Sequence, residues 1–130
     1  MKYLLDVNAL IAYGFRRHDY HAQVGAWMRS SKADQFLTCS ITDLGFVRIL
    51  GNIRVFGVDV AKARSLLLDL KSRAVLPLEF LPDANDVSFL PDWVKSPSHT
   101  TDGHLLQLAK TNNALLATLD KGIPGAFLIP

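Results

Sequence analysis

The chain has 130 residues, of which 49% are hydrophobic and 20% are charged, a composition typical of a soluble globular domain. Its one cysteine excludes an internal disulfide framework and fits a reducing cytoplasm. No apolar run approaches the roughly 20 residues needed to cross a bilayer, so we expect a single cytoplasmic domain over residues 1–130.

The hydrophobic pattern of the first half predicts alternating strands and helices. In chain order the elements are a strand at 3–5, helices at 7–15 and 21–30, a strand at 36–39, and a helix that starts near 40–42 and ends at 51–52. The hydroxyl of Ser40 or Thr42 is expected to cap that last helix by accepting a hydrogen bond from a free backbone amide. We expect its apolar face to consist of Leu44, Val47, Ile49 and Leu50.

The second half continues the alternation. Its predicted elements are a helix at 60–72, a strand at 75–81, a helix from 100 or 101 to 110, a strand at 114–119 and a short strand at 126–129. Asp59 is the expected cap of the first helix, and Thr100 or Thr101 that of the second. Pro77 restricts its strand to an edge or a strand end because proline donates no hydrogen bond to a neighbouring strand. We therefore predict an α/β sandwich with a mostly parallel sheet.

Four aspartates stand where the chain leaves a predicted strand or enters a predicted helix: Asp6, Asp43, Asp102 and Asp120. Asp6 and Asp120 follow apolar strands, and open parallel sheets bind ligands beyond the carboxyl ends of their strands. Asp43 and Asp102 lie near the first turns of helices, where backbone amides favour the ionised carboxylate. Four carboxylates that converge on one space repel one another, and a divalent cation, which prefers oxygen ligands, is the simplest relief.

The charge distribution is consistent with a polyanionic ligand. The formal net charge is +2, but when these four aspartates are set aside, eight acidic residues remain against 14 basic ones. A basic body around an acidic pocket suits a polymer that is held by its phosphates while metal ions act on one of them. A mildly basic surface without such a role gives the same totals.

Motifs around these aspartates resemble those of a known nuclease family. The run Tyr3–Ile11 resembles the opening of the PIN-domain nucleases, and within them the VapC-type toxins of toxin–antitoxin pairs. The segments Cys39–Leu50 and Thr101–Ala109 resemble the family's second and third motifs, and Thr118–Asp120 resembles the fourth. The likeness covers nearly the whole chain in the expected order.

This resemblance implies a PIN-like three-layer sandwich with a five-stranded, mostly parallel sheet between helices. It also implies a divalent-metal-dependent endoribonuclease, the toxin of a type II toxin–antitoxin pair, with an antitoxin that plugs the site, and a homodimer. One position departs from the family pattern, which usually has Glu where this chain has Asp43. Because this side chain is shorter by a methylene, either it reaches a metal through water or its helix sits closer.

The chemistry of RNA phosphodiester hydrolysis assigns roles to the four aspartates. Mg²⁺ or Mn²⁺ can activate a bound water and withdraw charge from the phosphate, and Mg²⁺ usually takes only one or two carboxylates directly. We assign Asp6 and Asp102 to direct coordination. Asp43 and Asp120 are then ligands of a second site or contacts bridged by water, one of which can orient the attacking water.

Three further residues have expected supporting roles. Asn8 and Thr118 are placed to hold carboxylates by hydrogen bonds. Arg48 either binds a substrate phosphate or balances the charge of the second aspartate, although a solvated helix arginine is also common. No histidines have the close spacing of metal ligands, so we interpret all four as surface or structural residues, and Trp27 and Trp93 as core residues.

Other interpretations of the aspartates stay open. A single aspartate at a helix start is more often a cap than a ligand. A response-regulator receiver needs adjacent acidic residues after its first strand, where this chain has Leu5-Asp6-Val7, and a haloacid-dehalogenase phosphatase needs Asp-x-Asp, where it has Asn8. Both fit poorly. The stronger alternative is a catalytically weak or inactive PIN-like module that binds RNA or a protein.

Overall fold

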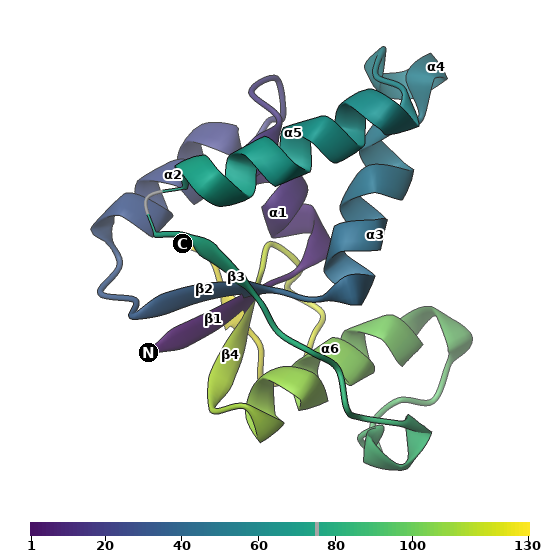
Figure 1. Ribbon diagram of the computed structural model, residues 1–130. Coiled ribbons are helices and arrows are strands. Elements are labelled where there is room, and N and C mark those ends of the chain that lie inside the picture. Colours follow the sequence, from purple (N-terminus) through teal and green to yellow (C-terminus); the bar gives the residue numbers. More distant parts are fainter. Residues whose placement is uncertain (75) are drawn as a thin grey trace.

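Residues 1–74 and 76–130, which the computed structural model describes, contain a sheet in which all neighbouring strands are parallel. Its strands are β1 (Lys2–Leu5), β2 (Gln35–Thr38), β3 (Leu78–Phe80), β4 (Ala114–Thr118) and β5 (Phe127–Leu128). Over the described residues the five strands lie in the order β3-β2-β1-β4-β5 (Figure 1). The predicted α/β fold with a parallel sheet is confirmed.

Helices cover both faces of this sheet. They are α1 (Val7–Gly14), α2 (His21–Ser30), α3 (Ser40–Leu50), α4 (Ile53–Phe56), α5 (Val60–Arg73) and α6 (Thr100–Thr111), with short 3₁₀ helices η1 (Val87–Phe89) and η2 (Pro97–His99). In Figure 1, α1, α2 and α5 lie on one side of the sheet and α6 lies on the other. The result is the expected three-layer sandwich. Within the described residues, no helix is long and apolar enough to cross a membrane.

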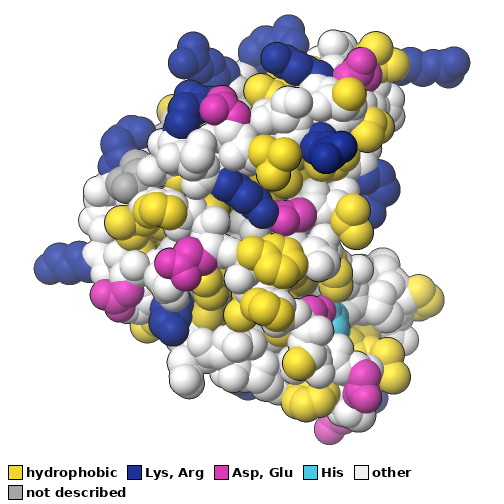
Figure 2. Space-filling view, in the orientation of Figure 1, with side chains coloured by type: hydrophobic (Ala, Val, Ile, Leu, Met, Phe, Trp, Pro, Cys, Tyr) yellow, Lys and Arg dark blue, Asp and Glu magenta, His cyan; other side chains and the backbone are white. Residues whose placement is uncertain are grey.

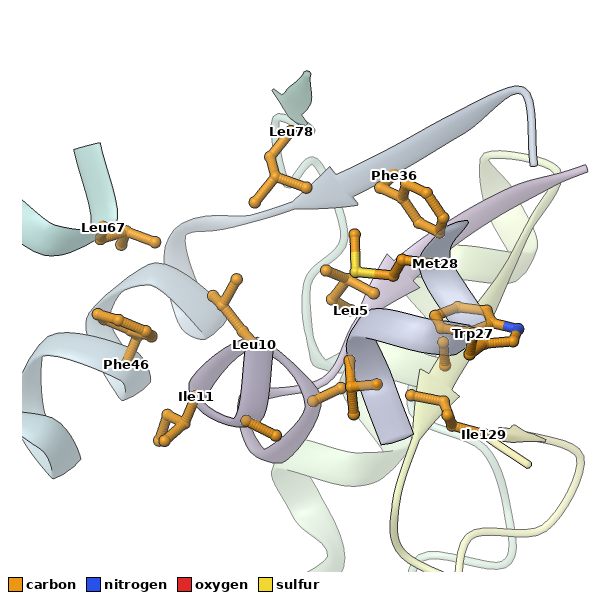
Figure 3. Close-up of a cluster of buried hydrophobic side chains, with 14 of the residues drawn as sticks. Leu5, Leu10, Ile11, Trp27, Met28, Phe36, Phe46, Leu67, Leu78 and Ile129 are labelled. Carbon is orange, nitrogen blue, oxygen red and sulfur yellow. The ribbon is translucent and has the colours of Figure 1, made fainter. Parts of the chain in front are cut away.

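Two separate hydrophobic clusters bury the two faces of the sheet, because successive side chains of a strand point to opposite faces. Leu5 of β1 packs in the cluster formed with α1, α2, α3 and α5, and its neighbour Leu4 packs in the cluster formed with α6. Figure 3 shows the first cluster, to which α1 contributes Leu10, α2 Met28 and β2 Phe36. Burial on both faces explains why the strand sequences are almost continuously apolar.

The helix starts agree with the sequence only in part. Asp59 caps α5 as predicted, since its carboxylate accepts a hydrogen bond from the backbone amide of Lys62 at 2.7 Å. At α3 the N-cap is Cys39, and the hydroxyl of Thr42 accepts a hydrogen bond from the Cys39 backbone amide at 2.9 Å. The prediction that Ser40 or Thr42 would be the N-cap is therefore wrong, because Thr42 stabilises the same helix start from inside the first turn.

The start of α6 also differs from the prediction. The residue before the helix is His99, and no side chain caps it. Thr100 is the first helical residue, and its hydroxyl donates to the carbonyl of Pro97 at 2.8 Å. The preceding 3₁₀ helix η2 leads directly into α6, so neither Thr100 nor Thr101 takes the place of a cap.

Two apolar segments lie differently from their predicted positions. The strand β3 lies at the edge of the sheet and begins after Pro77, as expected, although the predicted start at 75 lies outside the described residues.

Helix α3 buries Gly45 and Phe46, while Leu44 is 66% and Ile49 is 40% exposed. The predicted apolar face of α3 is thus wrong at Leu44 and Ile49.

Candidate functional site

The strand order reverses beside β1, and this places two of the four aspartates at one edge of the sheet. From β1 the chain builds β2 and β3 on one side, and later places β4 and β5 on the other. Asp6 directly follows β1, and Asp120 follows β4 after Leu119. Because β1 and β4 are parallel neighbours, both aspartates lie at the carboxyl edge of the sheet, where open parallel sheets bind ligands.

Asp102 reaches the same place from the first turn of α6. Asp6, Asp102 and Asp120 line one cavity of about 440 Å³, together with residues of α1, α3 and α4. Figure 2 shows the surface hollowed between the part of the molecule that carries α3–α5 and the part that carries α6. The structure thus brings three of the four candidate aspartates together.

Asp6 is held by its own helix and by the neighbouring strand. It is the N-cap of α1, and its Oδ1 accepts a hydrogen bond from the backbone amide of Val7 at 2.8 Å. Its Oδ2 accepts a hydrogen bond from the hydroxyl of Thr118, also at 2.8 Å. Asp6 is only 6% exposed. It is therefore a helix cap, as the simpler interpretation holds, and it also presents a buried carboxylate to the cavity.

The buried hydroxyl of Thr118 connects Asp6 to two neighbours. It has one proton, which it donates to Asp6, and its oxygen accepts hydrogen bonds from the side-chain amide of Asn8 at 3.1 Å and the backbone amide of Asp120 at 3.0 Å. The side-chain oxygen of Asn8 accepts a hydrogen bond from the backbone amide of Leu119 at 3.1 Å. Thr118 therefore contacts a carboxylate directly, whereas Asn8 acts one step further out, through Thr118.

Burial and the charges of neighbouring carboxylates disfavour the ionised forms of Asp6 and Asp102. Burial is the main cause that raises the pKa of Asp6 above its ordinary value, and the charge of Asp120 adds to it, against the lowering by its two hydrogen bonds. Burial also raises the pKa of Asp102, followed by the charges of Asp6 and Asp120, while His99 acts in the other direction. These charge effects are consistent with the cavity that the three groups share.

Asp43 lies elsewhere. It is on α3, at the packing contact with α5, and its Oδ2 receives a hydrogen bond and an ion pair from Nζ of Lys71 at 2.6 Å. Its Oδ1 is buried and has no hydrogen-bond partner among the described residues. The cavity that the other three aspartates share is not lined by Asp43. The structure therefore does not bring the second predicted aspartate to the site.

Helix geometry gives the reason for this placement. Each helix residue is rotated by about 100° from the one before it, so residues two positions apart, such as Asp43 and Gly45, differ by about 200°. Gly45 therefore points away from Asp43. Gly45 faces α1, and a Cβ atom added there would lie 2.6 Å from the side chain of Val7, next to Asp6. The side of α3 that approaches the site is thus the side of Gly45, and Asp43 faces α5 instead.

The cavity is also lined by apolar and basic residues. These are Ile11, His18, Arg48, Ile49 and Phe56. Arg48 was expected to bind a phosphate or to balance the second aspartate, but Lys71 occupies the balancing position. Sequence reasoning missed His18 and Phe56, because a loop and the four-residue helix α4 bring them here, and neither position carries a sequence signal of its own.

The other histidines and the tryptophans are structural or on the surface. Nδ1 of His21 is 2.8 Å from the carbonyl oxygen of Ala12, and His104 pairs with Asp83. Trp27 lies in the first hydrophobic cluster, and Trp93 packs against the second. Both tryptophans belong to the core, as predicted.

Comparison with known proteins decides the family. No family model matches the chain. Ribonuclease VapC38 of Mycobacterium tuberculosis is 38% identical over 125 residues, an alignment that covers 92% of this chain and 86% of the relative. This chain belongs to the VapC family. Ribonuclease VapC29 of the same species is 34% identical over 124 residues, an alignment that covers 95% of this chain and 89% of the relative.

A solved structure agrees with the VapC assignment at the level of the fold. VapBC2 from Rickettsia felis, bound to a DNA fragment from its promoter, matches with a TM-score of 0.63 over 98% of this chain and 97% of that one. Their sequence identity is 17%, so the match shows a shared fold. The predicted VapC-type family is thus confirmed by the relatives, and the sandwich by this structure.

The residues of this VapC cavity fit a hydrated hard cation. The donors are carboxylate oxygens that Mg²⁺ and Mn²⁺ prefer, and burial, together with neighbouring carboxylate charges, raises the pKa values of Asp6 and Asp102. Among the described residues, no three acidic, histidine or cysteine side chains form a ready-made metal cage. Mg²⁺ typically keeps several waters and binds only one or two carboxylates, so it does not require such a cage.

Proposed function

We propose that this protein is a divalent-metal-dependent endoribonuclease, a hydrolase of RNA phosphodiester bonds that serves as the toxin of a toxin–antitoxin pair. One observation carries the proposal: in a chain of the VapC family, whose curated relatives are named ribonucleases, three carboxylates from separate segments share one cavity at the strand switch point. A helix cap needs no such convergence.

Each residue of the cavity has a role in this proposal. Asp6 and Asp102 would hold Mg²⁺, or Mn²⁺ in its place, and a bound ion would make a water molecule more acidic and withdraw charge from the phosphate. Thr118 fixes the orientation of Asp6 through its hydrogen bond to Oδ2. Asp120 is exposed and its Oδ1 accepts a hydrogen bond from the backbone amide of Gly122 at 2.8 Å, which leaves Oδ2 to orient the attacking water.

Cleavage of labelled RNA by the purified protein tests this function. We expect activity with Mg²⁺ or Mn²⁺, none in excess chelator, and a loss of at least about 100-fold in Asp6→Asn or Asp102→Asn, since each removes a charge while nearly preserving shape. Asp69→Asn is a matched control, because Asp69 is exposed on α5 and forms an ion pair with Arg73 of the same helix. Full activity in chelator would refute the metal requirement, and full activity of both site variants would refute the site.

Growth tests address the toxin role. Expression of the wild-type chain should arrest growth, and expression of Asp102→Asn should not. If the wild-type chain accumulates without slowing growth and the RNA assay is also blank, the alternative of an inactive PIN-like binding module takes its place.

The partner chemistry follows from the same cavity. We propose that the antitoxin inserts a basic side chain, preferably an arginine that pairs with two carboxylate oxygens, among Asp6, Asp102 and Asp120. Its apolar residues would cover exposed hydrophobic side chains beside the cavity, such as Ile49 and Val55, which are 40% and 65% exposed. We also propose a homodimer, which light scattering at high concentration would contradict if it found only monomer.

A further inference from the structure

The cavity at the carboxylates has two chemically different ends. Asp6, the N-cap of α1, marks the end with the aspartates. Phe56 packs against Phe15, which directly follows the last residue of α1, and Arg48 and His18 line the same cavity. If only a metal ion bound here, the second end would have no use, since its groups are basic or apolar. Its volume of about 440 Å³ lies in the range of sites that bind small organic groups.

Arg48 is free to bind an anion. Its side chain is exposed, and it forms no ion pair within the part of the chain that the structure describes. The nearby carboxylate that it was expected to balance, Asp43, is paired with Lys71 on the other side of α3. An arginine can hold two oxygens of one phosphate through parallel hydrogen bonds.

Phe56 and its neighbours form a surface suited to a nucleobase. Phe56 is partly buried and packs edge-on against Phe15, with ring centroids 5.5 Å apart, so its ring is held in place. Ile11 and Ile49 line the same cavity. His18 accepts a hydrogen bond at Nδ1 from the backbone amide of Tyr20 at 3.1 Å, which leaves Nε2 as a donor when the ring is neutral. Aromatic rings bind bases by stacking without requiring a particular sequence.

The basic edge continues beyond Phe56. Arg17 lies over the Phe15 ring, 5.2 Å from its centroid, and its Nη2 donates to the carbonyl of Phe56 at 3.4 Å. Arg17, Phe15 and Phe56 also line an adjoining cavity. Figure 2 shows lysine and arginine side chains gathered over the α3–α5 part of that face rather than over the α6 part. The positive charge on this face therefore lies mostly on the α3–α5 side.

We propose that this end of the cavity is a nucleotide subsite: Arg48 binds the phosphate that neighbours the cleaved one, and the attached base stacks on Phe56. The strand then continues over Arg17. The subsite rests on the proposed ribonuclease function and adds to it the direction in which the RNA leaves the carboxylates. A base can stack on Phe56 only if it is not paired within a duplex, so the subsite takes single-stranded RNA.

Binding, rather than cleavage, tests the subsite. A fluorescent single-stranded RNA oligonucleotide is titrated with the Asp102→Asn protein in Mg²⁺ at several salt concentrations. We expect Arg48→Gln in this background to weaken binding by about tenfold and to reduce the slope of log K against log salt by about 0.7, the value for one phosphate contact on a single strand. Arg64→Gln, at an exposed arginine of α5, is the charge-matched control and should change neither quantity as much.

Phe56 variants separate stacking from charge. Phe56→Leu should weaken binding at least about fivefold with an unchanged salt slope, and Phe56→Tyr, which keeps the ring, should bind like the parent. If Phe56→Leu does not fold, the Arg48 and Phe56→Tyr results still decide, because Phe56→Tyr binding much more weakly than the parent would contradict a stacking wall. An RNA duplex that competes as well as the single strand would overturn the base-stacking part.

The outcomes also separate the subsite from the proposed function. If wild-type protein cleaves RNA but Arg48→Gln binds as the Arg64→Gln control does, the subsite is refuted and the nuclease stands. If the parent binds no oligonucleotide, the subsite is refuted, and a wild-type protein that also cleaves none refutes the proposed function with it.

Discussion

The ion pair of Asp43 and Lys71 provides a sharp test of the three-carboxylate site. The site predicted from the sequence has four aspartates, whereas the structure gives Asp43 a structural partner. We therefore consider the single variants Asp43→Asn and Lys71→Met and the double variant. Each single change leaves one charge without its partner between α3 and α5, and the double change removes both charges together.

The magnitude follows from the geometry. At 2.6 Å and an effective dielectric constant of about 20, the Coulomb attraction is about 6 kcal/mol. Removal of both charges from water offsets most of this, and the side chains of Lys71 and Asp43 are 19% and 21% exposed. Exposed pairs contribute about 0.2–1 kcal/mol, whereas breaking a buried pair costs about 3–5 kcal/mol. We expect a coupling energy between the two residues of about 1–2 kcal/mol.

Urea unfolding of the four proteins in chelator measures this coupling through the free energy of unfolding. The double variant should be more stable than the sum of the two single losses implies. RNA cleavage is measured in parallel, below the unfolding range, and Asp43→Asn should keep it within about tenfold of wild type, unlike Asp6→Asn. Our reasoning is refuted if the coupling is below about 0.5 kcal/mol and Asp43→Asn removes cleavage as completely as Asp6→Asn does.

Two further predictions concern the cavity itself. Thr118→Val removes the hydroxyl that forms hydrogen bonds with Asp6, Asn8 and Asp120. It should therefore lower the free energy of unfolding by about 1–3 kcal/mol and reduce cleavage about 10- to 100-fold. Thr118→Ser should keep most of both, and an equal loss in the two variants would contradict the hydrogen-bond role. Because the pKa values of Asp6 and Asp102 are raised above 3.8 in the folded protein, the unfolded chain releases these protons first, so the metal-free protein should lose stability as pH rises from about 4 through the folded pKa values. Thermal melts should show that millimolar Mg²⁺ restores this stability in wild type and not in Asp102→Asn, and a wild-type melt unmoved by Mg²⁺ at neutral pH would contradict the cation site.

The fold could be predicted because local signals agree with it. Residues 3–5 and 114–118 lie in strands that the sheet buries on both faces, so their hydrophobic runs are nearly continuous. The position of Asp6 and Asp120 followed from those strands, since the residue after a parallel strand lies at its carboxyl edge. Asp102 followed from the start of α6, whose apolar residues recur at helical spacing.

The rotation of α3 about its own axis could not be predicted in the same way. Its sequence has apolar residues on more than one side, and the side that is buried depends on where α1 and α5 lie. Gly45 decides the matter by allowing close approach to Val7, a contact between segments that are distant in the sequence. Asp43 therefore pairs with Lys71, and the exposed side of α3 includes Leu44. His18 and Phe56 enter the cavity for the same reason, through tertiary contacts alone.

The electrostatic arrangement bears on both the proposed catalysis and the proposed inhibition. Asp6 remains buried although burial and the charge of Asp120 both raise its pKa, so the folded protein without a cation holds its carboxylates under mutual repulsion. A divalent cation would relieve this repulsion, and so would the arginine of the proposed antitoxin, because both place positive charge among the same oxygens. The ion pair of Asp43 with Lys71 is satisfied within the fold and offers neither ligand a comparable gain. Among the described residues Asp6, Asp102 and Asp120 form no ion pair, so they are the group for which metal and inhibitor would compete. The fourth aspartate, Asp43, instead joins α3 to α5 through its ion pair.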